Sequence, residues 1–374
     1  MSPGRGSRRP DRRDPARPRL RPTVEVIPVS DGQLYLLRSD ADEDLCVQDT
    51  PSARALLAAL DGRTPLAELA RLLAADEQEL LGSVRELWQL GVLEDAADDD
   101  QLAPAHRERY EGQLRYFADM IGPGLSRVEP QLRLERSRVV VIGVGGLGSW
   151  VALSLACTGI GRLDLVDADV VELGNLNRQV LFREADLGRP KVAAAADSLR
   201  AFNTDVELHA HQRGVDSVDE IAELIDGAEM VIDAADWPPH LIERWINEAC
   251  FGAGVPYIAM SQFPPTVRIG PLYVPGRTGC YACVEQALRR EYPLFDEIVA
   301  VRSRRPSGAA TFGPACALIG SAVATDVVHW LTGICEPRTL GAALEVNLRT
   351  LTVLQRPVTP APECAICARQ PLAV

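Results

Sequence analysis

Aromatic residues and long apolar runs are scarce in this sequence. Phe, Trp and Tyr make up 5% of the 374 residues. No apolar run reaches the roughly 18 residues that a membrane-spanning helix needs, and the first residues lack the apolar core of a signal peptide. We therefore expect neither a membrane protein nor a secreted one, and a cytoplasmic location is the default.

A basic surface is also missing, and disulfides are not expected. The formal net charge of −13 argues against a nucleic-acid-binding protein, because such proteins present positive charge to phosphates. Nine cysteines are present, but disulfides are rare in the cytoplasm. Four of the nine form two Cys-x-x-Cys pairs, which is a spacing typical of metal sites.

The N-terminal part divides into three segments. Residues 1–22 hold eight arginines and five prolines, a composition that predicts a disordered basic tail. Residues 23–95 contain two short strand patterns and then three helical patterns, which indicates a small winged-helix domain. The helices are expected to begin at Thr50, Thr64 and Asp76. Residues 96–105 are acidic and interrupted by proline, so we expect a linker there.

Two runs within residues 23–95 are characteristic, namely LDGRTPLAELARLL and LWQLGVLED. With the strand pair, they resemble the PqqD-like peptide-recognition modules of peptide-modifying clusters. That resemblance implies a domain that binds the leader of a precursor peptide as an added β-strand. The segment carries 15 Asp and Glu against five Arg and no Lys, so repulsion from phosphates weighs against DNA binding. A plain oligomerisation or capping module is the alternative.

Residues 106–374 alternate between strand and helix patterns. Strands are predicted at 138–144, 162–169, 206–213 and 229–236, and helices at 146–160, 189–203 and 218–228. This alternation predicts an α/β domain with a doubly wound, mostly parallel Rossmann-like sheet. The stretch 289–310 reads as a long irregular loop that guides an acidic substrate or covers the site, or is simply solvated.

A glycine loop joins the first strand of this domain to its first helix. The pattern G-x-G-x-x-G is met by Gly143, Gly145, Gly146 and Gly148. Glycine lets the backbone approach a phosphate closely, and the following helix N-terminus attracts anions. The next strand ends at Asp167, which would accept hydrogen bonds from ribose hydroxyls, and Asp169 is expected at the same site. No G-x-x-x-x-G-K-[ST] motif is present.

The residues that follow favour ATP over a nicotinamide nucleotide. Additional donors lie just beyond the ribose-binding strand at Asn177, Arg178 and Gln179. Lys191 stands at the head of the next helix, and Asp236 offers a hard oxygen ligand for Mg²⁺. A triphosphate needs more such groups than a dinucleotide does. The set predicts an ATP and Mg²⁺ site, with Arg178, Lys191 and Asp236 as the catalytic residues.

The two cysteine pairs lie far apart in the sequence. They are formed by Cys280, Cys283, Cys364 and Cys367. Four thiolates complete a tetrahedral Zn²⁺ site and leave no open position. We therefore expect a structural zinc that ties the C-terminus back to the domain.

The ordered motifs GVGGLGS, LVDADVVELGNLNRQ, DLGRPKV and VIDAAD resemble the ThiF-type ubiquitin-activating-enzyme superfamily, over roughly residues 109–368. The resemblance implies that ATP and a carboxylate give an acyl-adenylate and pyrophosphate, and that the protein is a homodimer. It assigns Asp167 to the ribose, Arg178 and Lys191 to the phosphates, and Asp236 to Mg²⁺.

Two positions depart from the usual family pattern. Gly112 stands where members carry an Arg that crosses the dimer to the phosphates; either Arg109 or Arg115 substitutes for it, or the crossing Arg is absent. Trp237 stands where an Asn usually follows the Mg²⁺-binding Asp. A thioester-forming cysteine would be expected between the cysteine pairs, but residues 284–315 contain none, and Cys316 is expected to be buried packing in an apolar helix.

Three functions remain open from the sequence. The first is ATP-dependent adenylation of a carboxylate or amide in a precursor peptide captured through its leader. The second is activation of a sulfur-carrier or ubiquitin-like protein at its C-terminal Gly-Gly. The third is an inert leader-peptide scaffold for a partner modification enzyme, a cyclodehydratase. None of the three involves nucleic acid or a membrane.

Overall fold

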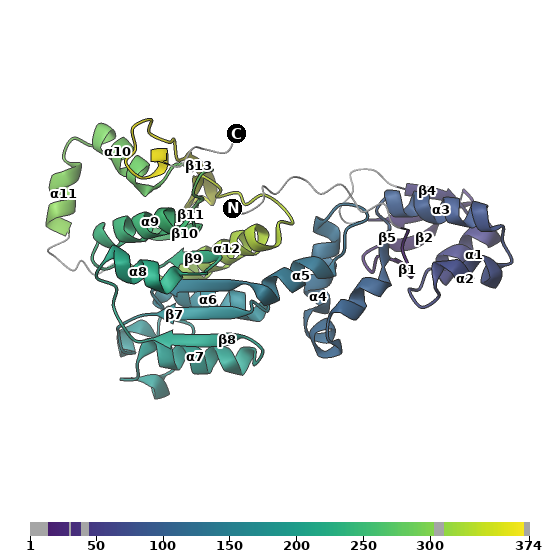
Figure 1. The fold of residues 1–374 in the computed structure, drawn as a ribbon, viewed down its shortest axis with the longest axis horizontal. Helices are drawn as coiled ribbons and strands as arrows, with labels where there is room; N and C mark the ends of the chain where they lie inside the picture. Colours follow the sequence, from purple (N-terminus) through teal and green to yellow (C-terminus); the bar gives the residue numbers. More distant parts are fainter. Residues whose placement is uncertain (1–13, 30, 39–44, 303–309, 370–374) are drawn as a thin grey trace. The chain divides into compact units, whose positions relative to one another are not determined.

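The computed structural model describes residues 14–29, 31–38, 45–302 and 310–369. The chain divides into two compact units, Met1–Leu132 and Arg133–Val374 (Figure 1). Helix α5 (Val128–Arg136) spans the division.

The first unit contains a three-stranded antiparallel sheet and three helices. The strands β2 (Glu25–Val29), β3 (Gln33–Leu37) and β4 (Leu45–Gln48) lie in the order β2-β3-β4. The helices are α1 (Pro51–Ala59), α2 (Leu66–Leu73) and α3 (Glu77–Gln89). The predicted strand pair and three helices are confirmed, whereas β4 was not predicted. Leu34 and Leu36 of β3 pack with Leu69 and Val84 from the helices in one apolar core.

Two of the three predicted helix starts are confirmed. The Thr50 hydroxyl accepts a hydrogen bond from the Ala53 amide, and Asp76 accepts from the amides of Gln78 and Glu79. The start at Thr64 is wrong, because α2 begins at Leu66 and Pro65 is its capping residue without a side-chain hydrogen bond.

The expected disordered tail is wrong for the part that the structure describes. Residues Pro18–Leu20 form β1, which pairs with β5 (Leu93–Asp95). Arg19 lies in β1 and binds Glu94 and Asp99 at 2.5 and 2.9 Å. Arg17 and Arg19 therefore have acidic partners far along the chain. Residues 1–13 lie outside the described residues.

The expected linker at 96–105 is a folded part of the first unit. It forms the 3₁₀ helix η1 (Ala96–Gln101) and the start of α4 (Pro104–Met120). Asp99 is buried and binds Arg127 at 3.1 Å. The acidic run is thus a set of ion-pair partners, which composition alone presents as a solvated linker.

The second unit is built on an eight-stranded sheet, in the order β13-β12-β11-β10-β9-β6-β7-β8. Its parallel part comprises β6 (Arg138–Ile142), β7 (Arg162–Val166), β8 (Glu207–His211), β9 (Met230–Asp233) and β10 (Tyr257–Phe263). This part confirms the predicted α/β fold with a mostly parallel sheet. An antiparallel extension, which was not predicted, adds β11 (Thr266–Tyr273), β12 (Ala342–Asn347) and β13 (Thr352–Pro357).

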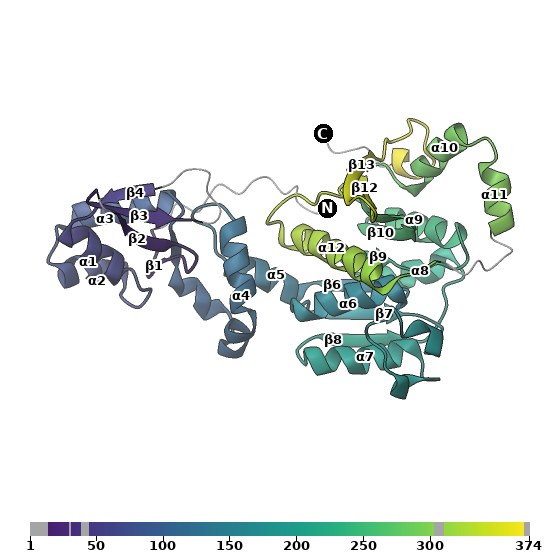
Figure 2. The same cartoon turned by 180° about the vertical axis from the view of Figure 1, so that it is seen from behind.

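Helices cover both faces of this sheet (Figures 1 and 2). One face carries α6 (Gly146–Cys157), α7 (Lys191–Phe202) and α12 (Gly313–Thr332), and the other carries α8 (Val218–Ile225) and α9 (Leu241–Ala253). Between α8, α9 and the sheet lies an apolar core that includes Val140, Val231 and Ile246.

The stretch 289–310 is partly helical, and helix α12 is unusually apolar. Within the stretch read as an irregular loop, α10 (Tyr281–Glu291) ends and α11 (Phe295–Arg302) follows, while residues 303–309 are not described. Helix α12 is long and apolar enough to cross a membrane by length and composition, but 61% of it is buried in the fold. It packs along α6 as a core helix.

Candidate functional site

The glycine loop after β6 fits only glycine at two positions. Gly143 has φ +92°, and a Cβ there would lie 2.5 Å from the carbonyl oxygen of Ala234. A Cβ on Gly148 would lie 1.9 Å from the carbonyl oxygen of Gly143. The loop therefore packs directly on the backbone that follows β9. It delivers the N-terminus of α6, with its unpaired amides and positive dipole end, to the carboxyl edge of the sheet.

Asp167 ties the glycine loop to the end of β7. Its Oδ2 accepts a hydrogen bond from the Val144 amide at 2.8 Å, and its Oδ1 accepts from the Asp169 amide at 2.9 Å. The carboxylate is held in place by backbone donors, and each oxygen keeps a further lone pair. This is the arrangement that a ribose-binding carboxylate needs.

Lys191 is the only lysine among the 39 basic residues of the chain. It is the first residue of α7, and its side chain is 8% exposed. Its Nζ contacts Asp169 Oδ2 at 2.8 Å, and its amide donates to the Asp169 carbonyl. Asp169, whose side chain is 69% exposed, is thus placed as the partner of Lys191.

Arg178 and its neighbours follow the 3₁₀ helix η2 (Leu173–Asn175). The Arg178 guanidinium donates to the Gly174 carbonyl at 2.8 Å and to Asn177 Oδ1 at 3.0 Å. Gln179 is 3% exposed, and its Oε1 has no hydrogen-bond partner. Its Nε2 lies 3.7 Å from the position of a Cβ on Gly145. A buried amide without a full set of partners beside the loop is typical of a site that awaits a ligand.

Asp236 lies at the same edge as the glycine loop. It is exposed and follows β9, only two residues after Ala234, which packs on Gly143. The structure thus brings the glycine loop, Asp167, Lys191 and Asp236 to the carboxyl ends of β6, β7 and β9. In open α/β sheets, ligands bind at this edge.

Sequence reasoning did not place Cys316 or Gln262 near the glycine loop. Cys316 is buried as expected, but its Sγ lies 3.1 Å from the position of a Cβ on Gly146. It also lies 3.5 Å from Gln262 Oε1. The apolar pattern of α12 predicts burial but gives no sign that its first turn borders the glycine loop.

Two buried carboxyl groups lie beneath this edge. Asp233 is the last residue of β9, and burial, with nearby Glu243, raises its pKa well above the usual value. Burial raises the pKa of Glu243 to about 7, and its Oε2 has no hydrogen-bond partner. Burial therefore favours the protonated, neutral form of both carboxyl groups over the ionised form.

The four pair-forming cysteines converge. Their sulfur atoms all lie within 4.8 Å of one another, and Sγ–Sγ distances include 3.5 Å for Cys280–Cys364 and 3.4 Å for Cys283–Cys367. A Zn–S bond of about 2.3 Å places tetrahedral sulfurs about 3.8 Å apart. The cluster can therefore hold a metal ion such as zinc, and it joins the start of α10 to the C-terminal 3₁₀ helix η4 (Cys367–Arg369).

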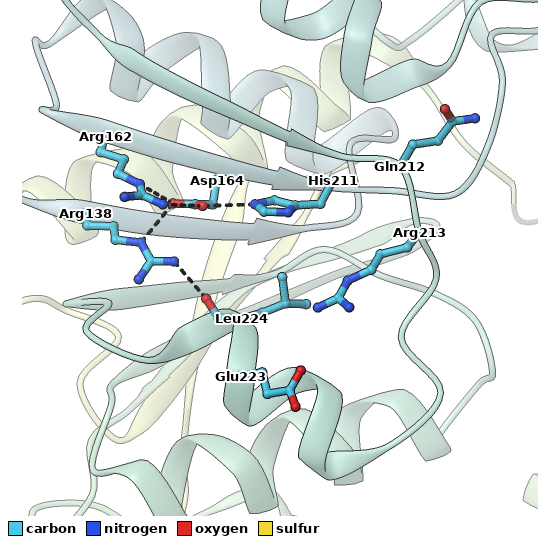
Figure 3. Close-up of a pocket in the computed structure, with 8 residues that line it drawn as sticks. All are labelled: Arg138, Arg162, Asp164, His211, Gln212, Arg213, Glu223 and Leu224. Carbon is cyan, nitrogen blue, oxygen red and sulfur yellow. Dashed lines mark hydrogen bonds and ion pairs between the residues drawn. The ribbon is translucent and has the colours of Figure 1, made fainter.

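A pocket of about 450 Å³ lies elsewhere, over β6, β7 and β8 beside α8 (Figure 3). At its floor, the fully buried Asp164 contacts Arg138 and Arg162 at 2.9 Å each and His211 at 3.0 Å. Burial raises the pKa of Asp164, but these hydrogen bonds outweigh burial and hold the pKa well below its usual value. None of the predicted nucleotide or metal residues lines the pocket, and its network satisfies the buried carboxylate.

The family model for the ThiF family matches residues 110–366. The chain belongs to the ThiF family. Its curated relatives include the sulfur carrier protein adenylyltransferase of Thermus thermophilus, which is 34% identical over 69% of this chain and 91% of its own length. The adenylyltransferase and sulfurtransferase MOCS3 of Mus musculus is 33% identical over 72% of this chain, and the match spans 56% of the mouse protein.

Solved structures match most of the length of this chain. Escherichia coli MccB, solved with ATP, gives a TM-score of 0.71 at 24% identity and covers 94% of this chain and 99% of MccB. PaaA gives a TM-score of 0.70 at 27% identity and covers 91% of this chain and 99% of PaaA. The predicted ThiF family is confirmed, and the two curated relatives named above are adenylyltransferases.

We predict that Lys191→Ala weakens ATP binding about tenfold to hundredfold, because it removes a charge-assisted contact to phosphate. Lys191→Arg should not restore binding, because the planar guanidinium is larger than an ammonium group. Titration calorimetry with Mg-ATP measures both. Arg200→Ala, which changes an exposed residue of the same helix, is the control. Unchanged affinity in Lys191→Ala would remove this residue from the phosphate site.

We predict about one tightly bound zinc per chain, which should be lost in Cys364→Ser together with part of the thermal stability. Elemental analysis and thermal unfolding test this. Cys157→Ser and Cys335→Ser, which change cysteines outside the cluster, should keep the metal. A stable, folded wild-type protein without metal would contradict the assignment.

We predict that Glu243→Gln stabilises the protein at pH 8. The pKa of Glu243 is about 7 in the folded state and about 4.3 in the unfolded state. The unfolding free energy of the wild type should therefore fall as pH rises from about 4 to 7, since ionisation then costs more in the folded chain. The melting temperature of Glu243→Gln should exceed that of the wild type at pH 8, and the two should converge below pH 5. Glu248→Gln, an exposed change on the same helix, is the control, and equal melting temperatures at pH 8 would refute the prediction.

Proposed function

We propose that this protein uses ATP to adenylate a carboxylate or amide of a precursor peptide that it captures through the peptide's leader. The observation that carries the proposal is that one sheet edge brings together the glycine loop, Asp167, Arg178, Lys191 and Asp236. The same chain also contains a unit whose sheet has an exposed edge strand. In the carboxylate case, an oxygen of the substrate attacks the α-phosphorus of ATP. The bond from the α-phosphorus to the oxygen that bridges it to the β-phosphorus breaks, so pyrophosphate leaves and the acyl-adenylate remains.

Each residue of the edge has a role in that step. The Asp167 carboxylate accepts hydrogen bonds from the ribose hydroxyls. The side-chain amides of Asn177 and Gln179 donate hydrogen bonds near the phosphates. Arg178 and Lys191 neutralise the charge that develops on the α-phosphate. Asp236 would hold Mg²⁺, whose charge favours departure of pyrophosphate.

The first unit has a strand edge suited to peptide binding. All five residues of β2 are exposed, and β2 is an edge of its sheet. Pro28 lacks an N–H, so it fits β2 only at a position that does not donate to β3. Because positions alternate in antiparallel pairs, Val26 then also directs its N–H and C=O outward. An extended leader can add here as a fourth strand, which is the PqqD-like, winged-helix mode of recognition.

The apolar character of this edge supports the same reading. Val26, Ile27 and Val29 are 37–39% exposed, and an exposed apolar edge strand favours pairing with another chain. The unit's acidic surface makes a peptide a better partner than nucleic acid. We further propose that the enzyme is a homodimer that acts in the cytoplasm, where a partner modification enzyme would take up the activated peptide.

A second candidate is activation of a sulfur-carrier protein at its Gly-Gly terminus. The observation in its favour is the 34% identity to the Thermus thermophilus sulfur carrier protein adenylyltransferase over most of that protein. In this case the first unit would not be needed for substrate capture. The two candidates therefore differ in whether β2 contributes to substrate binding.

We predict that purified protein exchanges labelled pyrophosphate into ATP only when the precursor peptide encoded beside its gene is present. Val26→Pro, which removes an outward donor from β2, should raise the peptide concentration needed for half-maximal exchange about tenfold, and leave that for ATP unchanged. Val26→Thr keeps the donor and is the control.

The outcomes separate the alternatives. Exchange that requires a Gly-Gly carrier and ignores Val26→Pro supports sulfur-carrier activation. No exchange with either substrate, in a protein that binds the peptide, supports the inert scaffold and contradicts adenylation.

A further inference from the structure

The first turn of α12 is built into the wall of the nucleotide site. Gly146, at the head of α6, lies between two side chains. A Cβ placed on it would be 3.1 Å from Cys316 Sγ and 3.3 Å from both Cγ and Cδ of Arg178. A side chain at position 146 would therefore not fit unless its neighbours moved. Cys316 and Arg178 thus both border the loop at Gly146.

The approach of α12 to this wall is set by glycines along its length. A Cβ on Gly313 would lie 2.7 Å from the Asn177 carbonyl oxygen, and one on Gly320 would lie 2.5 Å from the Cβ of Trp150. The Trp150 indole in turn donates to the Arg178 carbonyl at 3.2 Å. Helix α12 therefore packs against α6 and the Arg178 segment at the shortest separation that backbones allow. A shift of α12 away from one of these neighbours would therefore also change its packing against the others.

Cys316 has the environment of a packing group and not of a nucleophile. It is 1% exposed, and burial raises the pKa of its thiol, although nearby Arg178 acts in the opposite direction. Its sulfur lies at hydrogen-bond distance from Gln262 Oε1. A neutral, buried thiol is unreactive.

A second observation shows that this wall faces a ligand site. Gln179, 97% buried, lies on the Gly145 side of the same loop with its Oε1 unpaired. Cys316 and Arg178 thus border the loop at Gly146, and the Gln179 amide borders it at Gly145. The amide nitrogen lies on the Gly145 side, and the amide oxygen lacks a hydrogen-bond partner.

We propose that Cys316 is a positioning residue for nucleotide binding: the volume of its side chain sets the place of Gly146 and of the Arg178 side chain, and thereby the fit of the α-phosphate. The inference rests on the proposed nucleotide site. A larger group at position 316 pushes the loop and Arg178 apart. A smaller one leaves a void that the rigid contacts at Gly313 and Gly320 prevent from closing.

Titration calorimetry with Mg-ATP and steady-state kinetics test the proposal on the full chain. Cys316→Ser should bind ATP within about twofold of the wild type, whereas Cys316→Val should weaken binding about tenfold or more. The loss in Cys316→Val should appear as a raised KM for ATP, with kcat changed less. Cys157→Val, at the opposite end of α6, is the control for added volume.

A second variant covers the case in which Cys316→Val does not fold. Cys316→Ala leaves a void beside Gly146 and should weaken ATP binding about threefold or more, whereas Cys316→Ser, which nearly keeps the volume of the thiol, should not.

The inference is overturned if folded Cys316→Val, or Cys316→Ala, binds ATP as the wild type does. If Cys316→Ala binds ATP normally and yet loses the product, the thiol is a nucleophile and not a positioning group. If the wild type binds no ATP at all, the nucleotide site itself is refuted and the proposed function fails with it.

Discussion

The whole site depends on the close approach of backbone segments at the carboxyl end of β6. Gly143 lies against the Ala234 carbonyl, and Gly148 lies against the carbonyl of Gly143. Because these are contacts with backbone, no side-chain rearrangement could relieve a substitution. The Asp167 carboxylate then binds the Val144 amide. The glycine loop is thereby fixed between β7 and β9, and it presents one surface to a ligand.

The remaining parts of the second unit hold that surface in place. Arg178 and Lys191 come from segments beyond β7, and α12 closes the site where Cys316 meets the loop. The cysteine cluster acts at a distance, since it binds the C-terminal segment to the start of α10. The first unit has its own core and its own ion-pair network around Asp99 and Arg127. A separate core suits the proposed role of this unit in capturing the substrate.

Much of this glycine-loop edge was predictable because parallel strands place their carboxyl ends together. Motifs that follow β6, β7 and β9 in sequence therefore meet in space. Other features had no local signal. Cys316 reaches Gly146 from a distant part of the chain, and an apolar helix pattern specifies burial but not the neighbour. Residues 14–22 were mistaken for part of a tail because the acidic partners of Arg17 and Arg19, such as Asp99, lie in a segment that resembles a linker. The strand β10 and the antiparallel strands β11–β13 were not predicted, because they lie beyond the strand–helix alternation that identified β6, β7, β8 and β9.

The central claim is that the glycine-loop edge directs substrate attack to the α-phosphorus of ATP. Phosphorus NMR of a reaction containing the enzyme, Mg-ATP and the substrate that supports exchange tests it most directly, because it identifies the bond that breaks. The account predicts AMP and pyrophosphate in equal amounts, with formation of both abolished in Asp236→Ala. Formation of ADP and inorganic phosphate would show attack at the γ-phosphorus and would contradict the account.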